Sequence, residues 1–348
     1  MVAPRHNFLK IIKNGQPQGL PLQNPKPMNK LSILDAKVIA DNETLKVFEQ
    51  FGEITIWQTT KLDERIEHIG NANIVITNKV LMDKEVMDAC PNIKLICLAA
   101  TGMNLVDLDY ANQKGIVVKN VAGYSTDSVA QHTFTMLLYM LSKPAYFDNY
   151  IKSGEYAKLD VFCHFGPGFW ELKGKRWGII GLGAIGRKVA EIATAFGCEI
   201  VYYSTSGINN TTNYKRVELD ELLQTSNIVS IHAPLNDNTR GLISYPELQK
   251  MRRDAILINV GRGNIVDETA LAKALDEELI FGACLDVLAN EPIKTNNSLM
   301  QIKNKERLFI SPHIAWISKE ALSTLLKKTV ENIQVFLDNL YPCKQMFF

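Results

Sequence analysis

The stretch Trp177-Gly-Ile-Ile-Gly-Leu-Gly-Ala-Ile-Gly186 decides the fold class of this chain. A short apolar run, typical of a buried strand, leads into three glycines with the spacing GxGxxG. Beyond them, apolar residues recur at helical spacing as far as Gly197. A strand, a glycine-rich turn and a helix in this order predict the start of a dinucleotide-binding βαβ unit.

Each glycine of the turn has its own steric role in such a unit. Gly181 permits the tight turn, Gly183 lets the backbone approach a pyrophosphate, and Gly186 lets the helix close on the sheet. The amides of Ala184 and Ile185 then face the phosphates at the positive end of the helix. The sequence therefore predicts cofactor contacts from these five residues.

Short apolar runs and amphipathic stretches alternate on both sides of this turn. The runs that predict strands are 31–34, 54–57, 74–77, 95–98, 116–119, 177–180, 200–203, 228–231, 255–259 and 283–287. The stretches that predict helices include 44–51, 84–90, 125–141 and 319–339. This alternation is typical of parallel sheets that are covered by helices on both faces.

The position of the glycine turn indicates two domains, because about 150 residues, counted from residue 28, precede it, which is enough for a separate domain. We predict two Rossmann-like, doubly wound α/β domains with parallel sheets and a cofactor and substrate cleft between them. Residues 28–126 and 318–348 are the predicted substrate domain, and residues 127–317 the predicted cofactor domain. The proline-rich residues 1–27 are predicted to be a flexible extension.

The composition is that of a globular protein and argues against several kinds of partner. Hydrophobic residues make up 46% and charged residues 22% of the 348 residues, and the net charge is +1. This balance offers no basic field for nucleic acid or a membrane surface, and no apolar run reaches the roughly 18 residues of a spanning helix. The six cysteines are scattered without a CxxC pair, which favours a reducing, cytoplasmic location. No metal-ligand spacing is visible.

The residue after the strand 200–203 bears on the choice between NAD and NADP. An acidic residue at this point would bind the ribose hydroxyls of NAD and repel a 2′-phosphate. Ser204 stands there instead, and the nearest basic residues, Lys215 and Arg216, come later. A hydroxyl can bind either cofactor, so the sequence predicts NAD(H) or NADP(H) without choosing between them.

Three residues far apart in the chain have distinctive local settings. Arg262 lies in Asn259-Val-Gly-Arg-Gly-Asn-Ile-Val-Asp267, Glu291 precedes Pro292, and His313 lies in Ser311-Pro-His-Ile-Ala-Trp316. A guanidinium can bind a carboxylate and a ketone, an imidazole can move a proton, and a carboxylate can favour the charged imidazole. Together they predict chemistry on a 2-keto acid. Singly, each has a structural interpretation: a surface ion pair, a solvated carboxylate and a helix cap.

The combination of motifs resembles the D-isomer-specific 2-hydroxyacid dehydrogenase family over residues 28–348. Further matching stretches are Val121-Ala-Gly-Tyr-Ser-Thr-Asp-Ser-Val-Ala-Gln131, and His232-Ala-Pro-Leu235 with Thr239. The stretch His313-Ile-Ala-Trp316 is most similar to the glycerate dehydrogenase, or hydroxypyruvate reductase, branch. Formate dehydrogenases of the family carry an amide where Glu291 stands, so the chain does not resemble that branch.

This resemblance implies a role for each site residue. Arg262 binds the substrate, His313 exchanges the proton, and Glu291 orients His313. Backbone amides near Thr101 and Gly102 hold the substrate carboxylate. The remaining cofactor contacts that the resemblance implies are Thr126, Ser204, Pro234, Thr239, Val260, Gly261 and Asp286.

The implied activity is reversible hydride transfer between a nicotinamide cofactor and a small 2-keto or 2-hydroxy acid, with hydroxypyruvate and D-glycerate as the expected pair. The resemblance also implies a homodimer through the cofactor domain, with residues 125–141 and 144–151 as contacts. The alternative is a non-enzymatic, NAD(H)-sensing protein that resembles the related transcriptional corepressors, because the fold alone does not establish catalysis.

Overall fold

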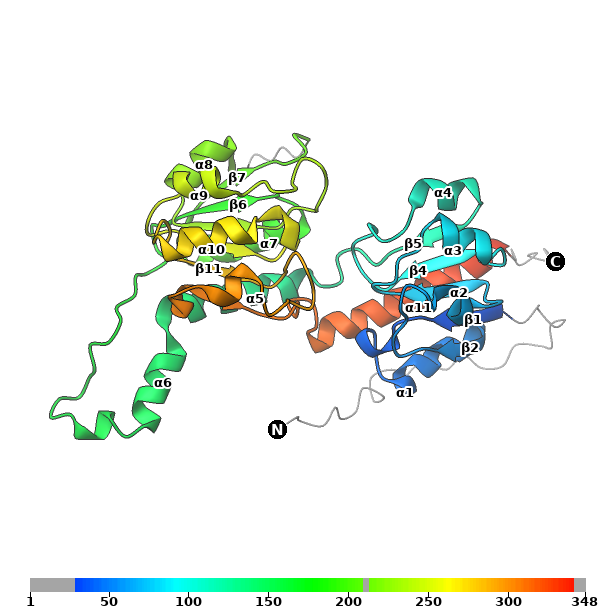
Figure 1. Ribbon diagram of the computed structural model, residues 1–348, viewed down its shortest axis with the longest axis horizontal. Helices are drawn as coiled ribbons and strands as arrows, with labels where there is room; N and C mark the ends of the chain where they lie inside the picture. Colours follow the sequence, from blue (N-terminus) through cyan, green and yellow to red (C-terminus); the bar gives the residue numbers. More distant parts are fainter. Residues whose placement is uncertain (1–28, 209–212, 341–348) are drawn as a thin grey trace, which may run out of the picture. The chain divides into compact units, whose positions relative to one another are not determined.

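The structure, a computed structural model, describes residues 29–208 and 213–340 (Figure 1). These residues divide into two compact units. Unit 1 contains residues 29–124 and 319–340, and unit 2 contains residues 125–318. The predicted extension, residues 1–27, lies outside the described residues. Which unit binds the substrate and which binds the cofactor stays a prediction at this level.

Unit 1 is built on a five-stranded parallel sheet with the order β2-β1-β3-β4-β5. Every residue of β3 and β4 is buried, as expected for central strands of a parallel sheet that is covered on both faces. The strands are β1 (Asn29–Ile33), β2 (Gly52–Ile56), β3 (Ile74–Thr77), β4 (Leu95–Leu98) and β5 (Val117–Lys119).

Three of the helices of unit 1 begin at aspartate caps. Asp41, Asp83 and Asp107 each accept a hydrogen bond from the backbone N–H three residues further on, which satisfies a donor that the first turn leaves unpaired. The helices are α1 (Asn42–Leu45), α2 (Arg65–Ile69), α3 (Lys84–Ala89), α4 (Leu108–Gln113) and α11 (Lys319–Leu340), with 3-10 turns η1 (Ala36–Val38) and η2 (Lys46–Phe51). The long α11 returns to this unit (Figure 1). There Asn332 Nδ2 donates to the carbonyl of Asn120 at 3.0 Å.

Unit 2 is built on a seven-stranded parallel sheet with the order β12-β11-β10-β9-β6-β7-β8. The strand order reverses beside β6, so the carboxyl ends of β6 and β9 flank a topological switch point, where ligands bind in sheets of this kind. The strands are β6 (Arg176–Ile180), β7 (Glu199–Tyr203), β8 (Lys215–Arg216), β9 (Ile228–Ile231), β10 (Ile256–Asn259), β11 (Gly282–Leu285) and β12 (Leu308–Ile310).

Two separate apolar cores lie against this sheet. One core holds Phe134, Trp177 and Val189, and the other holds Leu222, Leu248 and Leu271. Helices α5 (Thr126–Ser142) and α7 (Ala184–Ala195) contribute to the first core, and α8 (Leu219–Thr225), α9 (Tyr245–Lys250) and α10 (Glu268–Asp276) to the second. Between α5 and β6 lie α6 (Pro144–Lys152) and η3 (Tyr156–Lys158). The remaining 3-10 turns are η4 (Gly263–Ile265), η5 (Ser298–Gln301) and η6 (Lys305–Arg307).

The predicted α/β class with two parallel sheets is confirmed. The predicted strands 74–77, 95–98 and 228–231 have the observed bounds. The predicted helix 44–51 is only partly correct. The α-helix ends at Leu45, and the chain continues as the 3-10 helix η2. The sequence did not predict β8 and β12, which have two and three residues.

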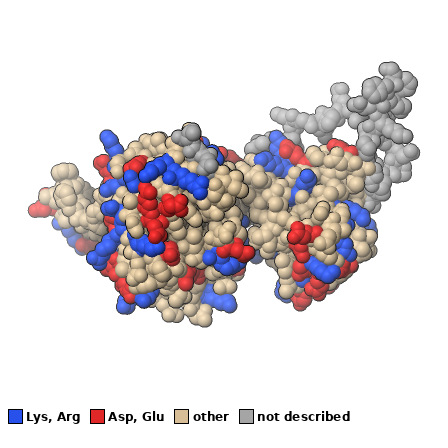
Figure 2. All heavy atoms as spheres, turned by 90° about the horizontal axis from the view of Figure 1, so that it is seen from above, with Lys and Arg blue, Asp and Glu red and all other residues tan. Residues whose placement is uncertain are grey.

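Charged side chains of both signs are interspersed on the face seen in Figure 2. Within residues 29–208 and 213–340, none of the helices combines the length and apolar character needed to cross a bilayer. In the same residues, no group of three or more His, Cys, Asp or Glu side chains is arranged to hold a metal ion.

Candidate active site

The glycine turn between β6 and α7 is shaped by close backbone contacts. Gly181 has a φ of +91°, which L residues rarely adopt, and a Cβ there would lie 2.8 Å from the nitrogen of Ala233. A Cβ at Gly186 would lie 2.4 Å from the carbonyl oxygen of Gly181. Both glycines therefore permit the tight turn and the close approach of α7. The structure places both residues as the sequence predicts.

Gly183 lies at the open side of the same turn. A Cβ built there meets nothing within 4 Å, so the space in front of the residue is open. Gly183 is also the N-cap of α7, and it provides no side-chain acceptor for the N–H groups of the first turn, which begins at Ala184. An exposed helix N-terminus with open space before it suits an anionic group. The turn therefore fits the pyrophosphate of a dinucleotide.

Ser204, the residue predicted to contact the cofactor ribose, directly follows β7. Ser204 is buried, and its Oγ is one of the buried side-chain oxygens without a hydrogen-bond partner among the described residues. Arg216 on the neighbouring β8 donates from Nη1 to the carbonyl oxygen of Gly207 at 3.0 Å. The hydroxyl thus directly follows β7, the guanidinium lies on the adjacent β8, and no carboxylate stands at Ser204.

The segment that follows β9 contains His232, Pro234 and Thr239 and borders the switch point of the sheet. Thr239 is fully buried, and its Oγ1 donates to the carbonyl of Pro234 at 2.7 Å. His232 is half-buried, and desolvation of its charged form lowers the pKa of His232 to about 3. His232 is therefore neutral at physiological pH and is no candidate for the acid. The cofactor contacts predicted for Pro234 and Thr239 stay predictions.

Arg262 follows β10 and is held by its own backbone segment. Its Nη1 donates to the carbonyl oxygen of Gly261 at 2.7 Å. The buried Asn259 donates from Nδ2 to the carbonyl of Arg262 at 2.9 Å and accepts the N–H of Gly261 at 3.0 Å. Val260 and Gly261, both predicted cofactor contacts, are buried in this turn. The role of Asn259 was not predicted, although a polar residue at the end of an apolar strand is the signal that could have indicated it.

Glu291 and His313 form a hydrogen-bonded pair. His313 Nδ1 and Glu291 Oε2 are 2.7 Å apart, and their side chains are 23% and 26% exposed. A carboxylate only accepts, so Nδ1 carries the hydrogen in this bond. Glu291 Oε1 also accepts the N–H of Leu288 at 3.1 Å. The sequence-predicted pairing of these two residues is present in the structure.

The backbone at His313 has a φ of +54°, which is uncommon for residues other than glycine. Asp286 fixes this turn, because its carbonyl accepts the N–H of His313 at 2.9 Å and its carboxylate accepts those of Ile314 and Ala315, both at 2.9 Å. Ser311 donates to the same carboxylate at 2.6 Å. Asp286 was predicted as a cofactor contact, and the structure shows it as the organiser of the His313 turn.

The electrostatics of Asp286 reflect competing effects. Burial alone would raise its pKa, but hydrogen bonds from His132, Ser311 and the backbone N–H groups of Ala315 and Ile314 outweigh burial and lower the pKa of Asp286 below its ordinary value. His132 Nε2 lies 2.9 Å from Ser311 Oγ, so this histidine, which is in an apolar helix by sequence, supports the buried carboxylate. The network of His132, Ser311 and Asp286 was not predicted.

All three predicted catalytic residues follow neighbouring strands of one sheet. Arg262 comes after β10, Glu291 after β11, and His313 after β12. Carboxyl ends of parallel strands share one edge of a sheet, so these side chains are carried by adjacent loops. A Cβ at Gly263 would lie 1.9 Å from the carbonyl carbon of Leu288, which shows that the Arg262 and Glu291 loops are in direct contact.

The residues predicted to bind the substrate carboxylate from unit 1 follow β4. Thr101 is exposed and Gly102 is half-buried. Asn120 donates from Nδ2 to the carbonyl of Thr101 at 2.7 Å. Thr126, the remaining predicted cofactor contact, is the first residue of α5 in unit 2 and is half-buried. Substrate and cofactor contacts from these residues stay predictions.

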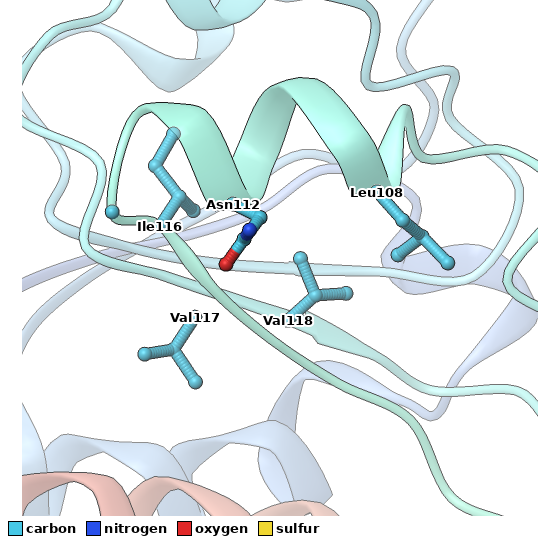
Figure 3. A pocket seen from close by; sticks show the side chains of 6 residues that line it. Leu108, Asn112, Ile116, Val117 and Val118 are labelled. Atoms are coloured by element: carbon cyan, nitrogen blue, oxygen red, sulfur yellow. The ribbon is translucent and has the colours of Figure 1, made fainter.

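A separate hollow of about 440 Å³ lies between α4 and β5 in unit 1. Figure 3 shows Leu108, Asn112, Ile116, Val117 and Val118 around it. Its lining has no acid, base or nucleophile, so it offers none of the chemistry that the strand-end residues of unit 2 offer.

Comparisons with known proteins extend over most of the chain. Residues 134–315 match the family described as D-isomer specific 2-hydroxyacid dehydrogenase, NAD binding domain. A hydroxypyruvate reductase of Blautia hydrogenotrophica is 35% identical over 314 residues, which cover 88% of this chain and 97% of that protein. A glyoxylate reductase of Thermococcus litoralis is 35% identical over 311 residues, which cover 86% and 91%.

The fold is also similar to solved structures. An acyclic imino acid reductase in complex with NADPH and D-Arg matches with a TM-score of 0.80 at 27% identity, covering 89% of this chain and 97% of that one. The similarity therefore includes both units and is not confined to the glycine turn.

Proposed function

Because this chain belongs to the D-isomer specific 2-hydroxyacid dehydrogenase family, we propose that it interconverts hydroxypyruvate and D-glycerate. Family membership makes the protein an NAD(P)-dependent 2-hydroxyacid oxidoreductase, which answers the alternative of a non-enzymatic sensor. The single observation that carries the proposed keto-acid reduction is the Glu291–His313 pair at 2.7 Å, on a loop that contacts the Arg262 loop. The choice of hydroxypyruvate rests on the similarity to a hydroxypyruvate reductase.

The proposed roles follow from the chemistry of the three side chains. Arg262 has a planar fork that can bind the carboxylate and the keto oxygen together. His313 gives a proton from Nε2 to the ketone during reduction and takes it back during oxidation. Glu291 holds Nδ1, which fixes the ring and stabilises its charged form. The amides near Thr101 and Gly102, at the end of β4, are proposed to bind the substrate carboxylate.

The cofactor contacts belong to the sheet edge of unit 2. When bound, the nicotinamide cofactor supplies the hydride for the keto carbon. Gly181, Gly183 and Gly186 shape the pyrophosphate turn, and the amides of Ala184 and Ile185 face it. The other proposed contacts are Thr126, Ser204, Pro234, Thr239, Val260, Gly261 and Asp286. Both NAD(H) and NADP(H) remain compatible with the hydroxyl of Ser204.

Glyoxylate is the second candidate substrate. The glyoxylate reductase and the hydroxypyruvate reductase are equally similar to this chain, at 35% identity. Both acids share the carboxylate and carbonyl that Arg262 can bind, and they differ in the hydroxymethyl group. Trp316 is half-buried against the core of α5 and α7, so packing accounts for much of its surface.

A homodimer through unit 2 is part of the proposal. Helix α6 has no buried side chain, and Figure 1 shows it extending away from the rest of unit 2. Phe162 and Phe165, which follow it, are 89% and 95% exposed. Large apolar side chains at this exposure are typical of a surface that another protein chain covers.

A reducing compartment, the cytoplasm, is also proposed. The cysteines of the described residues, Cys90, Cys97, Cys163, Cys198 and Cys284, are all free thiols, while Cys343 lies outside the described residues. Free, mostly buried thiols are typical of proteins that are kept reduced.

The experiment is a steady-state panel with the full chain. Hydroxypyruvate, glyoxylate and pyruvate are each reduced with NADH and with NADPH, and kcat/KM is compared. We expect the highest kcat/KM with hydroxypyruvate, and a loss of about 10²- to 10⁴-fold in His313→Ala with NAD(P)H binding retained. A higher kcat/KM with glyoxylate would replace the proposed substrate, and full activity of His313→Ala would remove the proposed acid.

A further inference from the structure

Glu268, the first residue of α10, accepts hydrogen bonds from residues on both sides of Glu291 in the loop that carries it. Its Oε1 accepts the N–H of Ala289 at 2.6 Å, and its Oε2 accepts Nδ2 of Asn297 at 2.6 Å. We propose that Glu268 is a positioning residue that holds this loop so that Glu291 stays hydrogen-bonded to His313. The inference rests on the proposed function, in which Glu291 and His313 act on the substrate proton.

The backbone of Glu268 is fixed from both directions. Asp267 caps α10 by accepting the N–H groups of Thr269 and Ala270 at 2.9 and 3.0 Å. Upstream, Gly263 packs so closely that a Cβ would lie 1.9 Å from the carbonyl carbon of Leu288. The short segment 262–268 therefore carries Arg262 at one end and Glu268 at the other. We call the two hydrogen bonds of Glu268, from Ala289 and Asn297, the clamp. The segment sets the positions of Arg262 and Glu291 together.

The clamp acts close to the donor that Glu291 uses. Glu291 Oε1 accepts the N–H of Leu288, and Leu288 directly precedes Ala289, which Glu268 holds. A shift of Ala289 moves the Leu288 donor and with it the Glu291 carboxylate. A hollow of about 340 Å³, lined by Glu268, Asn290, Lys294 and residues 296–298 among others, lies beside the loop. The loop therefore has room to move once the bonds are lost.

Glu268→Gln tests the clamp with little change of volume. Ala289 and Asn297 both donate to Glu268, and an amide has one acceptor and one donor group. In the glutamine variant the amide NH₂ therefore faces one of these donors, and that hydrogen bond is lost. We expect kcat/KM for hydroxypyruvate to fall about tenfold, because small displacements of reacting groups are costly in rate. In a Glu291→Gln background the same change should alter kcat/KM by less than about twofold, since the carboxylate it positions is gone. If Glu268→Gln lowers kcat/KM by the same factor in the wild type and in the Glu291→Gln variant, the proposal is overturned.

Asp276→Asn is the matched control. Asp276 is the last residue of the same helix, and its Oδ1 accepts the N–H of Lys303 at 2.8 Å. This bond holds the chain beyond the Glu291 loop, so its loss should leave kcat/KM and its pH profile unchanged. If Glu268→Gln folds poorly, Asn297→Asp replaces it, because an aspartate keeps the acceptor for the N–H of Leu299 but loses the donor to Glu268. A loss of activity in Asp276→Asn as large as in Glu268→Gln would reject the specific role.

A measurement without turnover separates this inference from the proposed function. The His313 ring is followed by NMR during a pH titration and is assigned by its absence in His313→Ala. Glu268→Gln should move the titration midpoint to lower pH, in the same direction as Glu291→Gln and by less. An unchanged midpoint overturns the role of Glu268 even in an active enzyme. Absence of turnover by the wild type with every keto acid would overturn the proposed function and leave the NMR result to decide on Glu268.

Discussion

At the scale of single residues, Arg262 offers geometry as well as charge. Its guanidinium is anchored on the carbonyl of Gly261, which leaves other N–H groups of the fork for a substrate. Arg262→Lys keeps the charge and loses the two-pronged contact. A hydrogen bond to a charged group contributes about 1.5–3 kcal/mol, so we expect kcat/KM for hydroxypyruvate to fall by about 10- to 100-fold, with a higher KM. Steady-state kinetics measure both constants. If Arg262→Lys has the same kcat/KM and KM as the wild type for several keto acids, Arg262 lies outside the site.

The Glu291–His313 pair makes a prediction about pH. Glu291→Gln removes the charge that stabilises the imidazolium form of His313. The protonated ring, which reduction requires, then persists only to lower pH, so the alkaline limit of keto-acid reduction should move to lower pH. Oxidation requires the neutral ring, so its acidic limit should move in the same direction. Profiles of kcat/KM against pH for wild type and variant measure both limits. Coincident profiles, or a shift to higher pH, would contradict the pairing.

Ser204 makes a prediction about the cofactor. Ser204→Asp introduces a charge at the proposed ribose position, where like charges about 4 Å apart repel by about 1 kcal/mol even in water. We expect the ratio of kcat/KM with NADH to that with NADPH to rise by at least about fivefold. Ser206→Asp, on the exposed part of the same loop, is the control for a general effect of loop charge. Equal ratios in the two variants would remove Ser204 from the ribose, and a thermal melt would show whether the buried position tolerates the carboxylate.

The sequence indicated the proposed catalytic residues more directly than the residues that hold them in place. Arg262, Glu291 and His313 stand in distinctive motifs, whereas His132 and Ser311 look like ordinary helix and loop residues. The His132–Ser311 and Ser311–Asp286 contacts join segments more than 20 residues apart, and no local pattern encodes such a separation. The buried position of Ser204 was also not predictable, because the residue lies where a strand gives way to a turn.

At the scale of elements, different glycines of the β6–turn–α7 unit serve helix packing and the proposed cofactor binding. Gly183 has a φ of −79° and open space at its Cβ position, whereas a Cβ at Gly186 would collide with the carbonyl of Gly181. Gly183→Ala should therefore fold normally and weaken NAD(P)H binding, because the methyl group occupies the space for the pyrophosphate. Gly186→Ala should lower the free energy of unfolding by about 1–3 kcal/mol.

Thermal melts and fluorescence titration with NADH and NADPH measure the two effects. A destabilised Gly183→Ala protein, or one with wild-type affinity for both cofactors, would contradict the assignment of the turn.

The strands that the sequence missed share a physical reason. β8 has two residues, both exposed, and β12 has three half-buried residues, so neither shows the buried apolar run that marks the central strands. Both are at sheet edges, where one side of the strand lacks a neighbour and burial is incomplete. The periodic pattern thus predicts the interior of each sheet, and tertiary pairing decides where the edges lie.

At the scale of the whole molecule, the chain builds two sheets and crosses between them twice. It leaves unit 1 after residue 124 and returns at Lys319 with α11. Unit 2 is therefore an insertion whose two ends enter near the start of α5 and leave after the His313 turn. The same two segments are joined within unit 2, because Ser128 donates to the carbonyl of Ala315 at 2.6 Å. The turn that carries His313 is thus tied to the beginning of the inserted unit.

The last prediction concerns assembly. Helix α6 contributes no buried side chain, and Phe162 and Phe165 beyond it are almost fully exposed. Exposed apolar surface of this kind is stabilised when a second copy covers it. We expect the wild type to have a solution mass near twice 39.1 kDa, and the variant with Phe162→Asp and Phe165→Asp to have the mass of one chain. Leu62→Asp, at a 64% exposed leucine of unit 1, is the control and should leave the mass unchanged. Light scattering after size-exclusion chromatography distinguishes these states, and a wild type that stays monomeric at micromolar concentration would reject the dimer.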